Sequence, residues 1–246
     1  AYIGSAGPAD FNEAMRDLTF AGTVADDRLA MLQTPGGSGS LRVAAGVILR
    51  ARPDVTIWVS SPTWANHVPL LGGAGLNLKP YTYYDEEKKA LDFEGMLDSL
   101  REIPRGDIVL LHTCCHNPTG IDPDEAQWRA IADVIVEREF LPFIDIAYQG
   151  FATDLDADAF MIRELAGRVP EMIVANSCSK NFGLYRDRVG ALFIVSADSN
   201  SRDVVQSQAN NVVRTMYSMP PDHGAAVVAM ILNDDKLRAE WIEEVA

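Results

Sequence analysis

The sequence has little of what marks secreted, membrane-bound or nucleic-acid-binding proteins. Its 246 residues include only three cysteines, and the adjacent pair Cys114 and Cys115 does not indicate a disulfide framework. No apolar run could span a bilayer, and no basic segment followed by an apolar stretch opens the chain. The 21 Lys and Arg against 35 Asp and Glu give a formal net charge of −14, without a basic stripe for phosphate backbones. We therefore predict a cytoplasmic protein without a nucleic-acid or membrane partner.

Apolar residues make up 48% of the chain, which is enough for a sizeable core. Short β-branched or apolar runs alternate with longer amphipathic stretches, a pattern typical of an α/β fold with a mainly parallel sheet sandwiched by helices. The predicted strands are 56–60, 108–113, 141–145, 172–177 and 189–195. The predicted helices are 41–49, 157–166, 199–214 and 224–232.

A further helix has the clearest start signal in the sequence. Asp122 can cap it, Pro123 suits the first helical position, and Glu125 can complete a capping box. We expect this helix to run to about Arg138.

The segment from Ser177 to Gly183 follows a predicted strand and contains Ser179 and Lys180. Open α/β sheets bind ligands at the carboxyl ends of their strands, so Lys180 is expected to face a crevice. A lysine there can form a Schiff base if desolvation or a neighbouring cation such as Arg188 lowers its pKa. Taken alone, the segment fits a solvated surface lysine better.

A glycine-rich turn from Thr34 to Ser40 precedes a predicted helix. Its backbone N–H groups and Ser38 hydroxyl can face a phosphate at the positive helix end. The turn lacks the Lys-Ser/Thr ending of a nucleotide P-loop, which argues against a nucleotide-binding protein. By itself it is equally consistent with a simple turn.

Asp145 and Tyr148 follow another predicted strand, and Asn117 follows a third. A pyridoxal 5′-phosphate (PLP) ring needs an anion at its pyridine nitrogen and a donor at its phenolic oxygen, which Asp145 and Tyr148 can supply. An Asp that caps the next turn and a Tyr that packs are the alternative. Zinc at Cys114-Cys115-His116 is rejected, since adjacent residues of an extended chain point to opposite faces and no second ligand cluster exists.

Three motifs together resemble the class I aspartate and aromatic aminotransferases. They are Cys-Cys-His-Asn-Pro-Thr-Gly at 114–120, Asp-Ile-Ala-Tyr-Gln-Gly-Phe at 145–151 and Ser-Cys-Ser-Lys-Asn-Phe-Gly-Leu-Tyr at 177–185. The resemblance runs from Tyr2 to the end of the chain. It implies the large PLP-binding domain of the type I fold over residues 1–246, a small-domain connection starting near 233–246, and the absence of most of the small domain.

The resemblance also implies a role for each site residue. Lys180 carries PLP through a Schiff base and moves the proton at the substrate α-carbon. Asp145 pairs with the pyridine nitrogen, with His67 behind it and His112 nearby. The remaining contacts are implied for Trp64 on the ring, Asn117 and Tyr148 at the phenolic oxygen, and Gly37, Ser38, Ser177, Ser179 and Arg188 at the phosphate. Trp64 and Asn117 also border the substrate.

In this family a homodimer completes each active site. Tyr2 is then expected to reach the phosphate of the neighbouring subunit, while Arg214 and Ser218 line its substrate pocket. Arg214 would receive the side-chain carboxylate of a dicarboxylic substrate. The family pattern also predicts cis peptide bonds at Ser61-Pro62 and Asn117-Pro118.

The implied activity is transfer of an amino group between an L-amino acid, aspartate or aromatic, and a 2-oxo acid such as 2-oxoglutarate. The arginine that binds the substrate α-carboxylate belongs to a C-terminal portion that this sequence lacks, so a chain of this length alone is expected to bind PLP with impaired turnover. A PLP-dependent lyase and a truncated PLP-binding domain without turnover remain open, because fold and cofactor do not determine the reaction.

Overall fold

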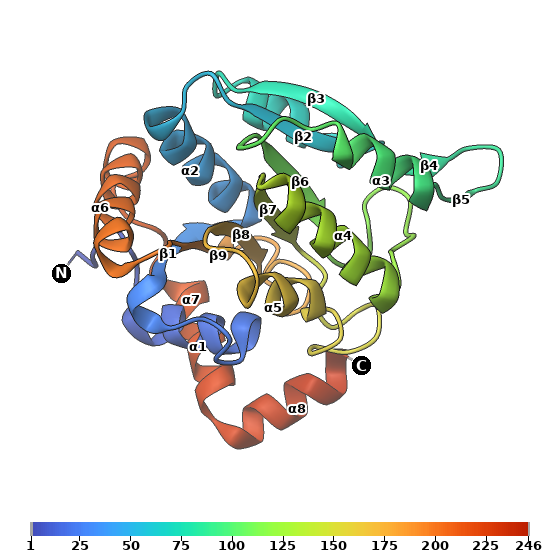
Figure 1. The fold of residues 1–246 in the computed structure, drawn as a ribbon. Coiled ribbons are helices and arrows are strands. Elements are labelled where there is room, and N and C mark those ends of the chain that lie inside the picture. The colour runs from blue at the N-terminus through green and yellow to red at the C-terminus, as the bar shows by residue number, and fades with distance from the viewer. Residues whose placement is uncertain (1, 246) are drawn as a thin grey trace.

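The computed structural model describes residues 2–245 and has a seven-stranded sheet at its centre (Figure 1). The strand order is β1-β9-β8-β7-β6-β2-β3, and a separate two-stranded ribbon pairs β4 with β5. Every neighbouring pair in the large sheet is parallel except those involving β9, which runs antiparallel to both β1 and β8. The strands are β1 Leu29–Pro35, β2 Thr56–Ser61, β3 Asn77–Thr82, β4 Tyr84–Asp85, β5 Ala90–Leu91, β6 Ile108–His112, β7 Leu141–Ile146, β8 Met172–Ser177 and β9 Val189–Val195.

Helices cover both faces of the sheet, which confirms the predicted α/β class. The helices are α1 Ala9–Phe20, η1 Asp26–Arg28, α2 Gly36–Ala51, η2 Val68–Gly72, α3 Phe93–Arg101, α4 Glu125–Arg138, α5 Phe160–Ala166, α6 Ser199–Met216, α7 Asp222–Asn233 and α8 Asp235–Val245. Buried side chains of α2 and α6 belong to one core, and those of α1, α3, α4, α5, α7 and α8 belong to the other. Among the described helices, none is both long and apolar enough to cross a membrane.

Successive side chains of a central strand point to opposite faces of the sheet, so each central strand contributes to both hydrophobic cores. In β6, Val109 and Leu111 belong to the core beneath α4, whereas Ile108 and Leu110 belong to the core beneath α2. All residues of β6, β8 and β9 are buried, as expected for strands covered on both faces. This explains why these strands are continuous apolar runs in the sequence.

The structure corrects three predicted helix starts. Helix α4 begins at Glu125, capped by Asp124 in a capping box with Gln127, so Asp122 and Glu125 do not have the predicted roles. Asp122 instead accepts hydrogen bonds from the backbone N–H groups of Cys115 and His116. Helix α2 starts within the glycine turn rather than at residue 41, and α5 starts at Phe160 rather than at 157. Both predicted cis bonds, Ser61-Pro62 and Asn117-Pro118, are confirmed.

The start of α2 lies directly against the neighbouring strand β9. A Cβ added to Gly190 of β9 would stand 2.6 Å from the carbonyl carbon of Gly36 and 2.7 Å from the carbonyl oxygen of Asn176. Both neighbours are backbone atoms of a helix start and a strand, so neither can move aside easily. Glycine at 190 therefore allows the close approach that positions the first turn of α2.

We expect Gly190→Ala to destabilise the fold by about 1–3 kcal/mol, because the added methyl group overpacks a site bounded by backbone. Urea unfolding monitored by circular dichroism measures the change. Gly4→Ala is the control, since a Cβ at Gly4 meets no atom within 4 Å. Equal stability of the two variants would contradict the proposed close approach.

Three buried histidines pack together beside the carboxyl ends of β2 and β6. The ring of His112 lies 5.0 Å from that of His67 and 4.5 Å from that of His116, measured between centroids. His116 also stacks on Tyr83 at 3.9 Å, and its two ring nitrogens contact the hydroxyls of Ser60 and Thr119 at 2.9 and 2.8 Å. Burial lowers the pKa of His112 to about 4 and that of His116 to about 3.

These lowered pKa values predict a loss of stability in mild acid. The unfolded chain takes up protons on these histidines below about pH 6.5, whereas the folded imidazoles stay neutral to much lower pH. The unfolding free energy should therefore fall as the pH drops from about 6.5 towards 4, by at most about 1.4 kcal/mol per pH unit for each histidine. Urea unfolding at several pH values measures this slope.

His116→Asn should reduce that slope between about pH 6.5 and 5, because it removes one group that titrates only in the unfolded chain. His223→Asn is the matched control, since His223 is exposed. An unchanged slope in His116→Asn would show that His116 does not remain neutral in the fold.

Candidate functional site

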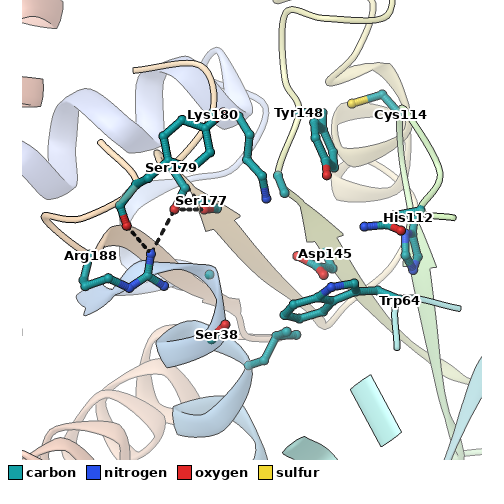
Figure 2. Close-up of a pocket in the computed structure, with 15 residues that line it drawn as sticks. Ser38, Trp64, His112, Cys114, Asp145, Tyr148, Ser177, Ser179, Lys180 and Arg188 are labelled. Atoms are coloured by element: carbon teal, nitrogen blue, oxygen red, sulfur yellow. Dashed lines mark hydrogen bonds between the residues drawn. The ribbon is translucent and has the colours of Figure 1, made fainter. Parts of the chain in front are cut away.

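A cavity of about 200 Å³ lies at the carboxyl ends of the parallel strands. Figure 2 shows that the side chains of Lys180, Asp145 and Arg188 approach it from different elements. Its lining consists of Gly37, Ser38, Leu41, Trp64, His112, Cys114, Asn117, Asp145, Ala147, Tyr148, Ser177, Ser179, Lys180, Tyr185 and Arg188. Ten of the residues predicted to bind the cofactor are among them.

Strand direction explains why these residues meet. Asp145 and Tyr148 come from the end of β7 and the loop after it, and Ser177 and Lys180 come from the end of β8 and its following turn. Arg188 precedes β9, and because β9 is antiparallel its first residue lies at the same edge of the sheet. Gly37 and Ser38 arrive through the first turn of α2.

Asp145 is the acidic group in the wall of the cavity. Its Oδ2 atom lies 2.8 Å from Nε2 of His67, and the exposed fractions of the two side chains are 11% and 0%. Nδ1 of His67 contacts the Thr63 hydroxyl at 2.7 Å, and the same hydroxyl lies 3.3 Å from Nε2 of His112. The carboxylate is therefore held by a chain of hydrogen bonds on its far side.

Lys180 projects its amine into the cavity from the turn after β8 (Figure 2). Its Nζ atom lies 4.7 Å from the centroid of the Tyr148 ring. The side chain is half-buried, so the amine is shielded on the ring side and accessible from the cavity. An amine placed in this way can attack an electrophilic carbonyl carbon that enters the cavity.

The other end of the cavity presents donors for an anion. Nη1 of Arg188 donates to the Ser179 hydroxyl at 3.2 Å and to the carbonyl oxygen of Tyr185 at 3.0 Å, and the hydroxyls of Ser177 and Ser179 lie 3.1 Å apart. Beside them the first turn of α2 has no side-chain cap on its N–H groups. A Cβ at Gly36 would collide with the Arg188 guanidinium, so glycine lets the helix start approach the cation. A helix start next to an arginine and two hydroxyls suits a phosphate.

Trp64 and Asn117 also line the cavity. Trp64 lies edge-on to His67, with 5.2 Å between ring centroids. Asn117 follows the buried His116 and begins the cis peptide to Pro118. His112 also lines the cavity, although the sequence predicted only that it lies near Asp145.

Three predicted site residues do not line this cavity. Tyr2 is 89% exposed. Arg214 lies at the end of α6, where its Nη1 atom donates to the Ser218 hydroxyl at 2.6 Å. The Ser218 carbonyl oxygen accepts from the Ser5 hydroxyl at 3.2 Å, so the N-terminal segment and the end of α6 meet at the surface.

The sequence analysis missed four residues of the lining. Ala147 lies in the motif at 145–151, Tyr185 lies in the motif at 177–185, and Cys114 begins the motif at 114–120. Leu41 follows Ser38 by almost one helical turn. The contact with the Cys115 thiol, and then burial, raise the pKa of the Cys114 thiol, which keeps it protonated. Across residues 2–245 no group of three or more His, Cys, Asp or Glu side chains is arranged to hold a metal ion.

Comparison with known proteins places this chain in a family. The sequence model described as "Aminotransferase class I and II" matches residues 1–246. The aspartate aminotransferase of Escherichia coli (strain K12) is 47% identical over 247 residues, covering 99% of this chain and 62% of that protein. The aromatic-amino-acid aminotransferase of Pseudomonas aeruginosa is 46% identical over 248 residues, covering 100% of this chain and 62% of that protein.

A solved structure agrees with these relatives. The aromatic-amino-acid aminotransferase of Burkholderia pseudomallei, covalently bound to pyridoxal phosphate, superposes with a TM-score of 0.97 at 39% identity, covering 100% of this chain and 62% of that one. The chain thus spans about 62% of the length of the relatives it matches. Since the family match extends over every residue of the sequence, the chain belongs to the class I and II aminotransferases.

Proposed function

We propose that this chain forms the cofactor site of a PLP-dependent transaminase that moves an amino group between an L-amino acid and a 2-oxo acid. One observation carries the proposal: a single cavity combines the Lys180 amine, the Asp145 carboxylate and an arginine-lined helix start. The named relatives include both aspartate and aromatic aminotransferases, and both substrate groups are therefore proposed.

The donor set of the cavity fits PLP. The cofactor carries a phosphate, an aldehyde, a phenolic oxygen and a pyridine nitrogen, and each has a counterpart in the wall. Arg188 and the two hydroxyls beside it suit the phosphate, the Lys180 amine suits the aldehyde, and the Asp145 carboxylate suits a protonated pyridine nitrogen. Asn117 and Tyr148 are the donors we assign to the phenolic oxygen.

The chain's own residues have separate tasks in the reaction. When bound, PLP supplies an electron sink for the electrons of the substrate α-carbon. Lys180 Nζ would move the proton from the α-carbon of the amino acid to the C4′ carbon of PLP, and in the opposite direction when the 2-oxo acid receives the amino group. The Asp145 carboxylate would stabilise the positive charge of the protonated pyridine nitrogen, and His67 positions that carboxylate. Trp64 covers the reacting region and limits the access of water.

The substrate pocket is proposed to need a second subunit. Tyr2, Arg214 and Ser218 all lie outside the cavity of their own chain, and exposed Arg214 can receive a carboxylate. We propose a homodimer in which these residues serve the neighbouring site. Residues 1–246 then act as the large PLP-binding domain, with the connection to a small domain starting near 233–246. The free cysteines favour a reducing compartment such as the cytoplasm.

Borohydride reduction in the presence of PLP tests the function directly. We expect mass spectrometry to find the reduced cofactor on the peptide that contains Lys180, because Lys180 is the only described lysine that lines the cavity. Lys180→Ala should lose the tag and keep its fold. Exposed Lys79 is the internal control. A tag spread over surface lysines, or absent, would contradict the proposal.

Asp145→Asn should keep the fold and slow amino-group transfer by about 100-fold or more, because a neutral amide cannot balance the positive charge of the protonated pyridine nitrogen of PLP. Stopped-flow absorbance of the first half-reaction with aspartate, in the complete protein, measures the rate. Asp107→Asn serves as control, since Asp107 is a half-buried carboxylate at the opposite edge of the sheet. Similar rates in the two variants would refute the role of Asp145.

A further inference from the structure

The C-terminal helix α8 has one buried residue, Trp241, among its described residues. Trp241 is 6% exposed, whereas the rest of the helix is exposed or half-buried. No residue of α8 lines the cavity. Any influence of α8 on the site must therefore pass through the residues that Trp241 and its neighbours contact.

Trp241 contacts the turn that carries Lys180. Its Nε1 atom donates a buried hydrogen bond of 2.6 Å to the carbonyl oxygen of Asn181, the residue next to Lys180. Its ring stacks on Phe182 with 4.4 Å between centroids and 7° between planes. One side chain thus holds two consecutive residues after Lys180, one through the backbone and one through its ring.

The turn is held on its other sides by short-range contacts. The Gly183 N–H donates to the Lys180 carbonyl oxygen at 2.9 Å, which closes the turn. Nδ2 of Asn181 donates to the Gln149 carbonyl oxygen at 3.2 Å. Gln149 follows Tyr148, so the turn is tied to the loop that carries the Tyr148 ring.

The end of α8 also packs on this second loop. A Cβ at Gly150 would collide with Val245 of α8, and Gly150 has a φ of +100°. In Figure 1 the end of α8 lies beside the loop between β7 and α5. The Gly150 N–H donates to Asp158 at 2.8 Å, which anchors this loop. Helix α8 therefore contacts both loops whose side chains, Lys180 and Tyr148, face each other across 4.7 Å.

We propose that Trp241 is a positioning residue that sets the place of the Lys180 amine relative to Tyr148 and the cavity. It acts through the Asn181 backbone and the Phe182 ring, without touching substrate or cofactor. The proposal rests on the function proposed above for Lys180. It makes α8 the element through which the chain that follows the domain can influence the reacting amine.

The test compares Trp241→Phe, which keeps an aromatic ring and removes the N–H donor, with Trp241→Ala, which removes both contacts. Trp128→Phe is the matched control, because Trp128 is a buried tryptophan of α4 that does not line the cavity. Hydrogen exchange of the peptide containing residues 179–183 is read on the cofactor-free protein. The circular dichroism of bound PLP, kcat and KM are read on the complete protein.

We expect Trp241→Phe to speed exchange of the Gly183 amide about tenfold, as for the loss of one buried hydrogen bond. Its PLP circular dichroism should weaken, and kcat should fall about tenfold with KM for the amino acid unchanged, because a misplaced amine affects the chemical step alone. Trp241→Ala should show larger changes of the same kind. Trp128→Phe should leave all of these readouts at the wild-type value.

Two results would overturn the inference. In the first, Trp241→Phe matches Trp128→Phe in hydrogen exchange, PLP circular dichroism and kcat. In the second, hydrogen exchange of Trp241→Phe rises uniformly over the whole chain, which indicates a structural role only. If Trp241→Ala does not fold, the Phe variant decides. The borohydride tag of the wild-type protein separates the two proposals: without a tag on Lys180 the function fails, and with it only the role of Trp241 is in question.

Discussion

Strand direction is the constraint on which the site depends. Strands β2, β6, β7 and β8 are parallel neighbours, so the residues that follow them reach one edge of the sheet. Strand β9 runs the other way, which brings the residue before it, Arg188, to that same edge. Reversing β9 alone would move the guanidinium to the far side of the molecule. An amine, a carboxylate and a cation from the ends of three different strands meet because of this arrangement.

Close backbone contacts hold this edge together. Gly190 allows β9 to touch the start of α2, and Gly36 allows that start to approach Arg188. Each of these glycines has two opposing effects on stability. It weakens the helix or strand in which it lies, and it permits a tertiary contact that no larger residue allows. The result is a helix terminus whose unpaired N–H groups and adjacent guanidinium are held in place before any anion arrives. Preorganised charge of this kind lowers the free energy that would otherwise be needed to reorganise the site when an anion binds or when charge develops in a transition state.

Much of this could be predicted from the sequence, and the exceptions have physical causes. All five predicted strands were found, and three of them, β6, β8 and β9, are apolar runs buried along their whole length. Strand β1 was missed because it contains buried Gln33 and Thr34, and β3 because it is a partly exposed edge strand with Pro80 in it. The start of α2 was placed too late, since glycines rarely begin a helix unless a tertiary contact requires them.

For the site, the motifs located the polar residues, and strand order explains why they converge. Leu41 lines the cavity as an apolar side chain, and nothing in its local sequence distinguishes it from a core residue. The contact of Trp241 with Asn181 joins residues sixty positions apart, so local patterns could not reveal it. Sequence patterns report chemistry and local periodicity, whereas packing between distant elements has to be seen in three dimensions.

The hydrogen-bond chain behind Asp145 has a direction. A carboxylate only accepts, so Nε2 of His67 must carry the proton that points to it, which leaves Nδ1 of a neutral His67 as an acceptor. The Thr63 hydroxyl then donates its single proton to Nδ1 and accepts from Nε2 of His112. Both neutral imidazoles are thereby restricted to the Nε2-protonated tautomer. The two lone-pair acceptors of one carboxylate oxygen thus determine where the protons lie on two histidines and a hydroxyl several ångströms behind it.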